Sequence, residues 1–134
     1  MSDLFANARA IAGDIAAGRV SAVEICRQAL DRIGRLNTSL NAFNLVTDER
    51  ALDRAAEIDR LRASGSALGP LAGVPIAVKD NMCVRGMRTT ASSRILDSFA
   101  PPYDATTIIK LEQAGAVIVG KTNCDEFAMG SSNE

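Results

Sequence analysis

Two short apolar runs constrain the fold of this chain more than any other feature. The first covers residues 73–78 (Gly-Val-Pro-Ile-Ala-Val) and the second covers residues 116–119 (Ala-Val-Ile-Val). Short runs rich in β-branched side chains predict strands that are buried on both faces. A helical pattern lies between them; we expect Asp104 to cap its start and Gly115 to follow its last turn. A strand, a crossover helix and a second strand make a parallel unit, so the sequence predicts an α/β fold.

The residues before the first run follow a helical period in three segments. The first segment stops at Gly18. The second starts at Ser21, which forms a capping-box pattern with Glu24, and the third starts at Thr47 or Asp48. The positions expected to face the core are Leu4, Ala8, Ile11 and Ile15, then Ala22, Cys26, Ala29, Ile33 and Leu36, and finally Ala51, Ala55 and Ile58.

These elements divide the 134 residues into connected parts of one domain. Residues 1–65 are mainly helical, with a short strand expected at residues 43–46. Residues 63–72 hold small residues, Gly and Pro, which predict a loop. Residues 73–122 read as strand, loop, helix and strand. Within them, residues 81–102 form an irregular stretch rich in Thr and Ser, and stretches this long are more often functional than idle.

Composition excludes several classes of function. A net charge of −1 and 4% aromatic residues argue against a nucleic-acid or anionic-membrane surface. Neither a secretory leader nor a run of ~20 apolar residues is visible, so we expect no membrane span. Three scattered cysteines indicate reduced thiols in a cytoplasmic protein, and their spacing predicts no metal site.

The chain contains no histidine, so acid–base chemistry near neutral pH would need a lysine, a carboxylate or a cysteine. Lys79 is the leading candidate because it directly follows the first apolar run. An ammonium in that position either reaches water or lies in a site that uses an amine. From the local pattern alone, both readings stay open.

A second motif is misleading. Residues 115–122 match the Walker A pattern letter for letter. A phosphate-binding loop needs flexible residues between its glycines, whereas here those residues form the second predicted strand. Their amides would belong to a sheet ladder, so we expect no nucleotide there. Lys121 and Thr122 would lie at the carboxyl edge of the sheet, where ligands of open α/β sheets bind.

Several motifs together resemble the amidase signature family. Residues 73–81 are similar to its lysine motif, and residues 89–93, 102–106 and 115–123 follow in the family's order. Residues 125–134 resemble, within that family, the glutaminase A subunits of glutamyl/aspartyl-tRNA amidotransferases. The resemblance implies a mixed, largely parallel central sheet covered by helices. Residues 1–134 would be the N-terminal portion of one such domain, and therefore an incomplete fold.

The resemblance also implies a chemistry. The family hydrolyses amides with a Ser–cis-Ser–Lys triad, in which Lys79 would be the base. Both serines belong to a Gly/Ser-rich segment that this sequence lacks, so we expect an inactive isolated chain. The layers that would cover Lys79 are also absent, so we expect this lysine to be solvated. The complete protein would release ammonia from glutamine to transamidate mischarged Glu-tRNA(Gln) or Asp-tRNA(Asn). B and C subunits would complete a heterotrimer, and a partner subunit would use ATP and Mg, leaving no cofactor in this chain.

Two other functions remain open: a stand-alone amidase for small amides, and a non-catalytic, truncated or partner-contacting module. Met129, Gly130 and Ser131 could offer backbone groups to the substrate, or form a plain loop. The hydroxyls of residues 89–93 could shape a pocket or only cap turns. Cys26 is expected in the core.

Overall fold

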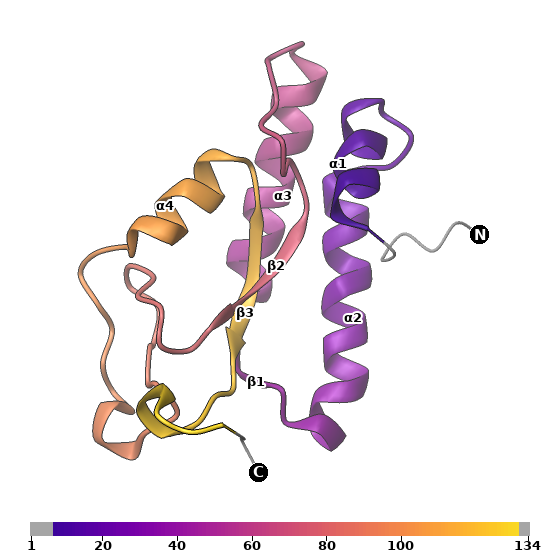
Figure 1. Ribbon diagram of the computed structural model, residues 1–134. Coiled ribbons are helices and arrows are strands. Elements are labelled where there is room, and N and C mark those ends of the chain that lie inside the picture. The colour runs from indigo at the N-terminus through magenta and orange to yellow at the C-terminus, as the bar shows by residue number, and fades with distance from the viewer. Residues whose placement is uncertain (1–6, 132–134) are drawn as a thin grey trace.

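The computed structural model describes residues 7–131, which build a small mixed sheet with helices on both sides (Figure 1). The strands are β1 (Phe43–Val46), β2 (Pro75–Lys79) and β3 (Val117–Thr122), in the order β1-β3-β2. β2 runs parallel to β3, and β1 runs antiparallel to it. The parallel unit and the α/β class predicted from the sequence are confirmed.

The helices form two layers around this sheet. They are α1 (Ala8–Ala16), α2 (Ala22–Leu40), α3 (Asp48–Ala63) and α4 (Thr106–Gln113), with short 3₁₀ helices η1 (Arg94–Leu96) and η2 (Glu126–Ala128). One core joins α1, α2 and α3 to Val117 and Val119 of β3. A second core joins Ile108 of α4 to Val78 and Ile118. Alternate residues of β3 therefore contact opposite layers, as a strand period of two requires.

Helices α2 and α3 start where the sequence predicts, but only α2 has a side-chain cap. The Ser21 hydroxyl accepts a hydrogen bond from the Glu24 amide at 3.0 Å, which confirms the predicted cap of α2. Asp59 of α3 accepts bonds from two further first-turn amides of α2, at 2.8 and 3.1 Å. Helix α3 starts after Thr47, one of the two expected caps, but the Thr47 hydroxyl donates to the Ile118 carbonyl instead. These bonds fasten α2 to α3 and α3 to the sheet.

The start of α4 differs from the prediction. Its N-cap is Ala105, which makes no side-chain cap bond. Asp104, the expected cap, accepts a bond from the Arg85 amide at 2.7 Å and so belongs to the preceding loop. The end of α4 is as predicted: Gly115 has a φ of +91°, and a Cβ there would lie 2.8 Å from the Ala72 Cα. That position therefore requires glycine.

Most of the positions expected to face the core are buried. The buried ones are Ile11, Ile15, Ala22, Cys26, Ala29, Ala51, Ala55 and Ile58. Ile33 is half-buried, whereas Ala8, in the first turn of α1, and Leu36 are exposed, contrary to expectation. Leu36 borders an open apolar groove of about 280 Å³ between the last turns of α2 and the sheet, so its helix face meets solvent. Leu4 lies outside the described residues.

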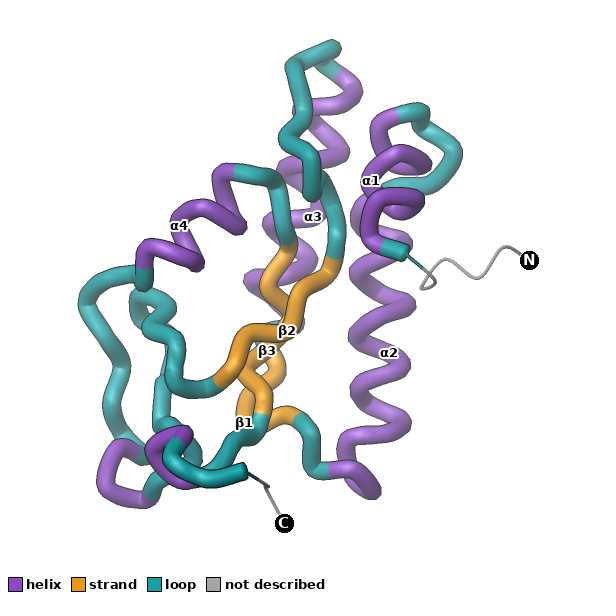
Figure 2. Tube along the Cα trace, viewed as in Figure 1, coloured by secondary structure: helices purple, strands orange, loops and turns teal. Residues whose placement is uncertain are grey.

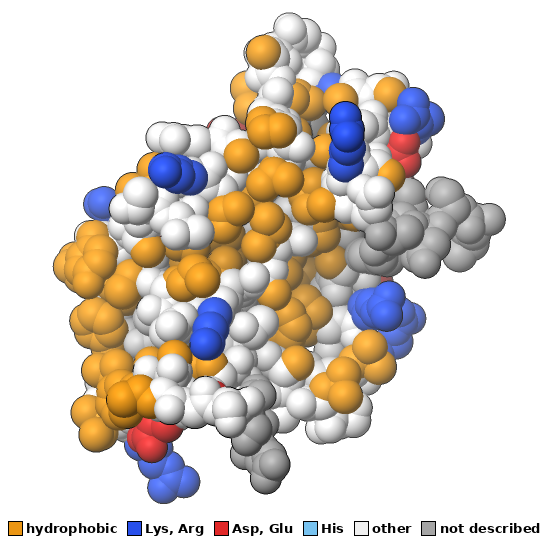
Figure 3. All heavy atoms as spheres, viewed as in Figure 1, with side chains coloured by type: hydrophobic (Ala, Val, Ile, Leu, Met, Phe, Trp, Pro, Cys, Tyr) orange, Lys and Arg blue, Asp and Glu red, His pale blue; other side chains and the backbone are white. Residues whose placement is uncertain are grey.

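The prediction that both apolar runs are buried on both faces is right for β3 and wrong for β2. Every residue of β3 except Thr122 is buried. In β2 only Val78 is buried, while Ala77 and Lys79 are exposed. β3 has a strand on each side and helices on both faces, whereas β2 lies at the edge with one neighbour. Figure 3 shows apolar side chains gathered over the middle of the face that carries β2.

A long loop connects β2 to α4, interrupted by η1 (Figure 2). This loop and the segment after β3 meet at the carboxyl edge of β2 and β3, where the candidate site lies. Within residues 7–131, no helix combines the length and hydropathy that a membrane crossing requires.

Candidate functional site

Lys79 is the last residue of β2 and is exposed at the carboxyl edge of the sheet. It pairs in register with Thr122 of β3, and its carbonyl accepts a bond from the Met82 amide at 3.0 Å, which closes a turn. The expectation that Lys79 is solvated is confirmed. Its side chain shares the exposed face of β2 with Ala77, because residues two apart on a strand point the same way.

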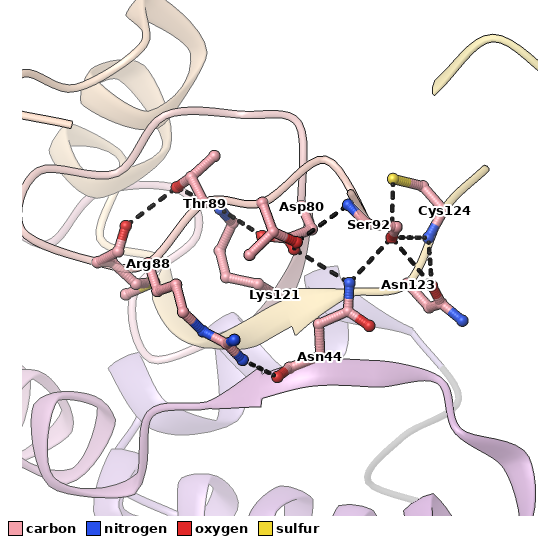
Figure 4. Close-up of polar contacts among 10 residues, drawn as sticks. Asn44, Asp80, Arg88, Thr89, Ser92, Lys121, Asn123 and Cys124 are labelled. Carbon is pink, nitrogen blue, oxygen red and sulfur yellow. Dashed lines mark hydrogen bonds and ion pairs between the residues drawn. The ribbon is translucent and has the colours of Figure 1, made fainter. Parts of the chain in front are cut away.

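The next residue, Asp80, lies in an entirely different environment. Its carboxylate forms an ion pair with Lys121, with Nζ and Oδ1 3.1 Å apart, and the two side chains are 1% and 0% exposed (Figure 4). The other carboxylate oxygen accepts bonds from the Thr90 hydroxyl at 2.5 Å and from the Asn44 amide at 3.0 Å. Lys121 also donates to the Thr89 hydroxyl at 2.8 Å. These five residues form one polar cluster, in which every member is buried except the half-buried Asn44.

Two irregularities in the sheet bring the cluster together. Between β2 and β3 the register moves from Ile76↔Ile118 to Ala77↔Gly120, so β3 carries one extra residue. As a result, Lys121 pairs with Val78 and points to the same side as Ile118, three positions earlier. In β1 the register shifts between Phe43 and Leu45, at Asn44. Bulges of this kind redirect side chains, and both lie beside the cluster.

The carboxylate of the pair is held in its charged form. Burial raises the pKa of Asp80, but hydrogen bonds from Thr90 and Asn44 and the contact with Lys121 together lower that pKa below its ordinary value. The pKa of Lys121 is lowered overall, because burial outweighs the opposing effect of the Asp80 carboxylate. Asp80 is therefore an ion at neutral pH, and Lys121 is its counter-charge.

The Thr- and Ser-rich loop ties the strand ends together. Ser92 donates to the Asn123 side chain at 3.0 Å and accepts a bond from the Cys124 amide at 3.1 Å. Ser93 donates to Glu126 at 2.7 Å and also accepts from an amide of η1. Thr90, Ser92 and Ser93 also line a shallow polar pocket of about 360 Å³. Both open readings of these hydroxyls, pocket lining and turn capping, therefore have support.

Met129, Gly130 and Ser131 lie at the same edge as Lys79. The Asp80 carbonyl accepts from the Ala91 amide at 3.0 Å, and the Ala91 carbonyl accepts from the Phe127 amide at 2.9 Å. This chain of bonds anchors η2, which leads into the three residues. All three are exposed. A role for their backbone in substrate binding stays a prediction.

The sequence pattern indicates Lys79 but not the polar cluster that contains Asp80 and Lys121. From the sequence, Lys121 is expected only at the strand end, within the rejected Walker A match. Residues 117–122 do form a paired strand, as expected, but Lys121 is the largest fully buried side chain among the described residues. The only local signal was Asp80, a second charge beside an apolar run. Across residues 7–131, no three His, Cys, Asp or Glu side chains gather as a metal site would require.

Cys26 is buried in the core of α2, as predicted, and burial, with a smaller effect from Asp48, raises the pKa of its thiol to about 11. It is therefore an inert core thiol. Cys124 is buried beside Ser92, and Cys83 is half-buried near Tyr103.

Comparisons with known proteins agree with the motifs. The sequence model of the family described as Amidase matches residues 24–134. The chain is 56% identical to the A subunit of glutamyl-tRNA(Gln) amidotransferase of Heliobacterium modesticaldum, over 86% of this chain and 24% of that protein. It is 51% identical to the protein of the same name from Carboxydothermus hydrogenoformans, over 97% of this chain and 27% of that protein. The chain thus spans about a quarter of the length of the curated relatives it matches.

Solved structures of an amidase and of an amidotransferase subunit are also similar to this chain. The peptide amidase of Stenotrophomonas maltophilia is 35% identical, with a TM-score of 0.85 over 92% of this chain and 26% of that chain. The A subunit of glutamyl-tRNA(Gln) amidotransferase of Thermotoga maritima is 38% identical, with a TM-score of 0.66 over 83% and 22%. The family match covers most of the sequence, and the lysine motif lies within it at the edge of the sheet. This chain belongs to the amidase family.

Proposed function

We propose that this chain supplies the base, Lys79, for the glutaminase reaction of a tRNA-dependent amidotransferase. The observation that carries this proposal is the placement of Lys79: the residue is exposed at the carboxyl end of β2, whereas the adjacent Asp80 carboxylate is buried against Lys121. Ligands of open α/β sheets bind at the carboxyl edge. The identity of 56% to the A subunit of an amidotransferase supports this substrate class.

In the proposed reaction, the Lys79 amine takes a proton from a middle serine, which takes the proton of the nucleophilic serine. That oxygen attacks the amide carbon of glutamine, and the proton held by Lys79 returns through the middle serine to the amide nitrogen, which leaves as ammonia. Water then hydrolyses the ester, releasing glutamate and restoring the serine hydroxyl. Backbone groups of Met129, Gly130 and Ser131 would hold the acyl portion. Because the two serines lie outside this sequence, we propose that the chain alone does not turn over glutamine.

The same proposal covers the assembly. B and C subunits would complete a cytoplasmic heterotrimer that acts as an ATP-dependent ligase in protein biosynthesis. A partner subunit would use ATP and Mg, and the ammonia would amidate mischarged Glu-tRNA(Gln) or Asp-tRNA(Asn).

A stand-alone amidase for small amides is the second candidate. The observation in its favour is the backbone agreement: the TM-score is 0.85 with a peptide amidase and 0.66 with an amidotransferase subunit. A third candidate is a non-catalytic module that contacts a partner.

A chimera tests these candidates. This chain replaces the corresponding quarter of the A subunit from Heliobacterium modesticaldum, which is produced with its partner subunits; we call the product the completed enzyme. We expect glutamine hydrolysis, and we expect Lys79→Ala to lower kcat by about 10²–10⁴-fold, the usual contribution of a general base. Lys110→Ala is the matched control, because Lys110 is an exposed lysine on α4.

The outcomes separate the three functions. Hydrolysis of small amides but not of glutamine supports the stand-alone amidase. No hydrolysis of either substrate supports the non-catalytic module. Equal activity of Lys79→Ala and Lys110→Ala contradicts the role of Lys79.

A further inference from the structure

We propose that Asp80 and Lys121 are positioning residues for Lys79: their buried ion pair fixes the end of β2 so that the Lys79 amine faces the carboxyl edge, and it keeps the Asp80 carboxylate away from that amine. This inference rests on the proposed function, since it assumes that Lys79 acts as the base.

Hydrogen bonds hold the Asp80 main chain and its Oδ2, whereas the buried Oδ1 makes no hydrogen bond and meets Lys121 Nζ 3.1 Å away. The Asp80 amide donates to the Thr122 carbonyl at 3.0 Å and its carbonyl accepts from the Ala91 amide at 3.0 Å. Its carboxylate is held by Thr90, Asn44 and Lys121. The main chain and side chain of one residue are thus fixed by three separate segments. Because successive side chains on a strand point to opposite faces, fixing Asp80 on the buried face directs Lys79 to the open one.

Charge supplies the second argument. A carboxylate that can reach a lysine stabilises its ammonium form, which cannot accept a proton. Asp80 carries such a carboxylate and is adjacent in sequence to the proposed base. In the fold its charge is matched by Lys121, on the side of the sheet away from Lys79. The pair therefore removes a competing partner from Lys79.

The desolvation cost of the buried pair also favours a functional role for it. Two ions that are 0% and 1% exposed carry a large desolvation cost, and an apolar pair of similar volume is often as stable or more so. Packing alone gives no reason for an Asp–Lys pair at this place. Lys121 cannot take over the role of Lys79, because its Nζ is enclosed by Asp80 and Thr89.

The test is a double-mutant cycle in the completed enzyme. The neutral double variant Asp80→Asn/Lys121→Met is made with Lys79 present and in a Lys79→Ala background in which added ethylamine replaces the missing amine. We expect the double variant to lower kcat by about tenfold or more when Lys79 is present, with KM changed by less than about twofold. With Lys79→Ala and ethylamine, we expect a change of less than about twofold.

The readouts separate positioning from a loss of stability. If the double variant lowers both rates by the same factor, the pair supports the fold in general and the positioning proposal is wrong, while the proposed function stands. If Lys79→Ala alone leaves the rate unchanged, the proposed function is wrong, and the positioning proposal, which depends on it, is wrong as well. Rates are divided by the folded fraction measured by circular dichroism.

A second measurement uses the 134-residue chain and needs no activity. Amide hydrogen exchange is followed at Asp80, Met82 and Ala91, whose amides donate at the strand end and its turn. We expect exchange at these sites to become about tenfold faster or more in the double variant, with exchange in α3 unchanged. Unchanged protection at all three amides would overturn the proposal. Thr90→Val, which removes one donor to the carboxylate but keeps both ions, is the milder variant and should show the same pattern to a smaller extent.

Discussion

The replacement of Lys121 by methionine should destabilise the protein far more than the replacement of Lys121 and Asp80 together. Methionine fills much of the same volume, so the main loss is the counter-charge of Asp80. That carboxylate would remain 1% exposed, with only the Thr90 and Asn44 donors. Removing one partner of a buried ion pair typically costs about 3–5 kcal/mol.

This cost is large for a chain of 134 residues. Typical stabilities of roughly 0.05–0.15 kcal/mol per residue give about 7–20 kcal/mol in total, so Lys121→Met would remove a substantial part. Asp80→Asn should cost a similar amount, because the Lys121 ammonium would lose its counter-charge and keep only neutral acceptors such as the Thr89 hydroxyl. The neutral double variant leaves no buried charge, and its cost should stay within about 2 kcal/mol.

Urea unfolding followed by circular dichroism measures all four proteins. With a slope of about 2 kcal/mol per molar, each single variant should lower the midpoint by about 2 M and the double variant by about 1 M or less. The interaction energy of the two residues is the stability change of the double variant minus the sum of the changes of the two single variants. A double variant that loses as much stability as the two single variants combined would refute the reasoning, because the two charges would then act independently.

Three further predictions concern single residues. The pKa of Asp80 is lowered in the folded state, so its contribution to the free energy of unfolding is complete above the ordinary aspartate range and is lost as pH falls through the lower folded value. Asp80→Asn should therefore reduce the loss of stability with falling pH in that range. Urea unfolding at a series of pH values from 7 to 2 measures this. Gly120→Ala should cost about 1–3 kcal/mol of stability, because its Cβ would lie 2.4 Å from a carbonyl oxygen of β1. Gly34→Ala, at an exposed position of α2 with nothing within 4 Å, should gain about 0.5–1 kcal/mol. Thermal unfolding compares the two variants, and equal effects would contradict the packing argument. Cys26, with a thiol pKa raised to about 11 by burial, should react with Ellman's reagent only on unfolding, whereas half-buried Cys83 should react first. Peptide mapping locates the labelled thiol. Fast labelling of Cys26 would contradict this prediction and would show that its helix opens in the native state.

The sequence predicted those features that depend on neighbours along the chain. The Ser21 cap, strand β1 at residues 43–46 and the glycine that ends α4 all follow from local patterns and were correct. Lys79 is a candidate base on local grounds alone, because it ends an apolar run in a chain without histidine. Each of these inferences needs only residues within a few positions of one another.

The environment of each charge was decided by tertiary structure. Lys79 and Lys121 both lie at the carboxyl ends of apolar runs, yet one is exposed and the other is 0% exposed. The difference arises because β2 is an edge strand while β3 is central, and because a bulge in β3 turns Lys121 toward Asp80. Strand order, register and bulges are set by pairing between residues far apart in the sequence. A local pattern can therefore place a lysine at the end of a strand, but only the assembled sheet determines whether its amine faces solvent or a buried carboxylate.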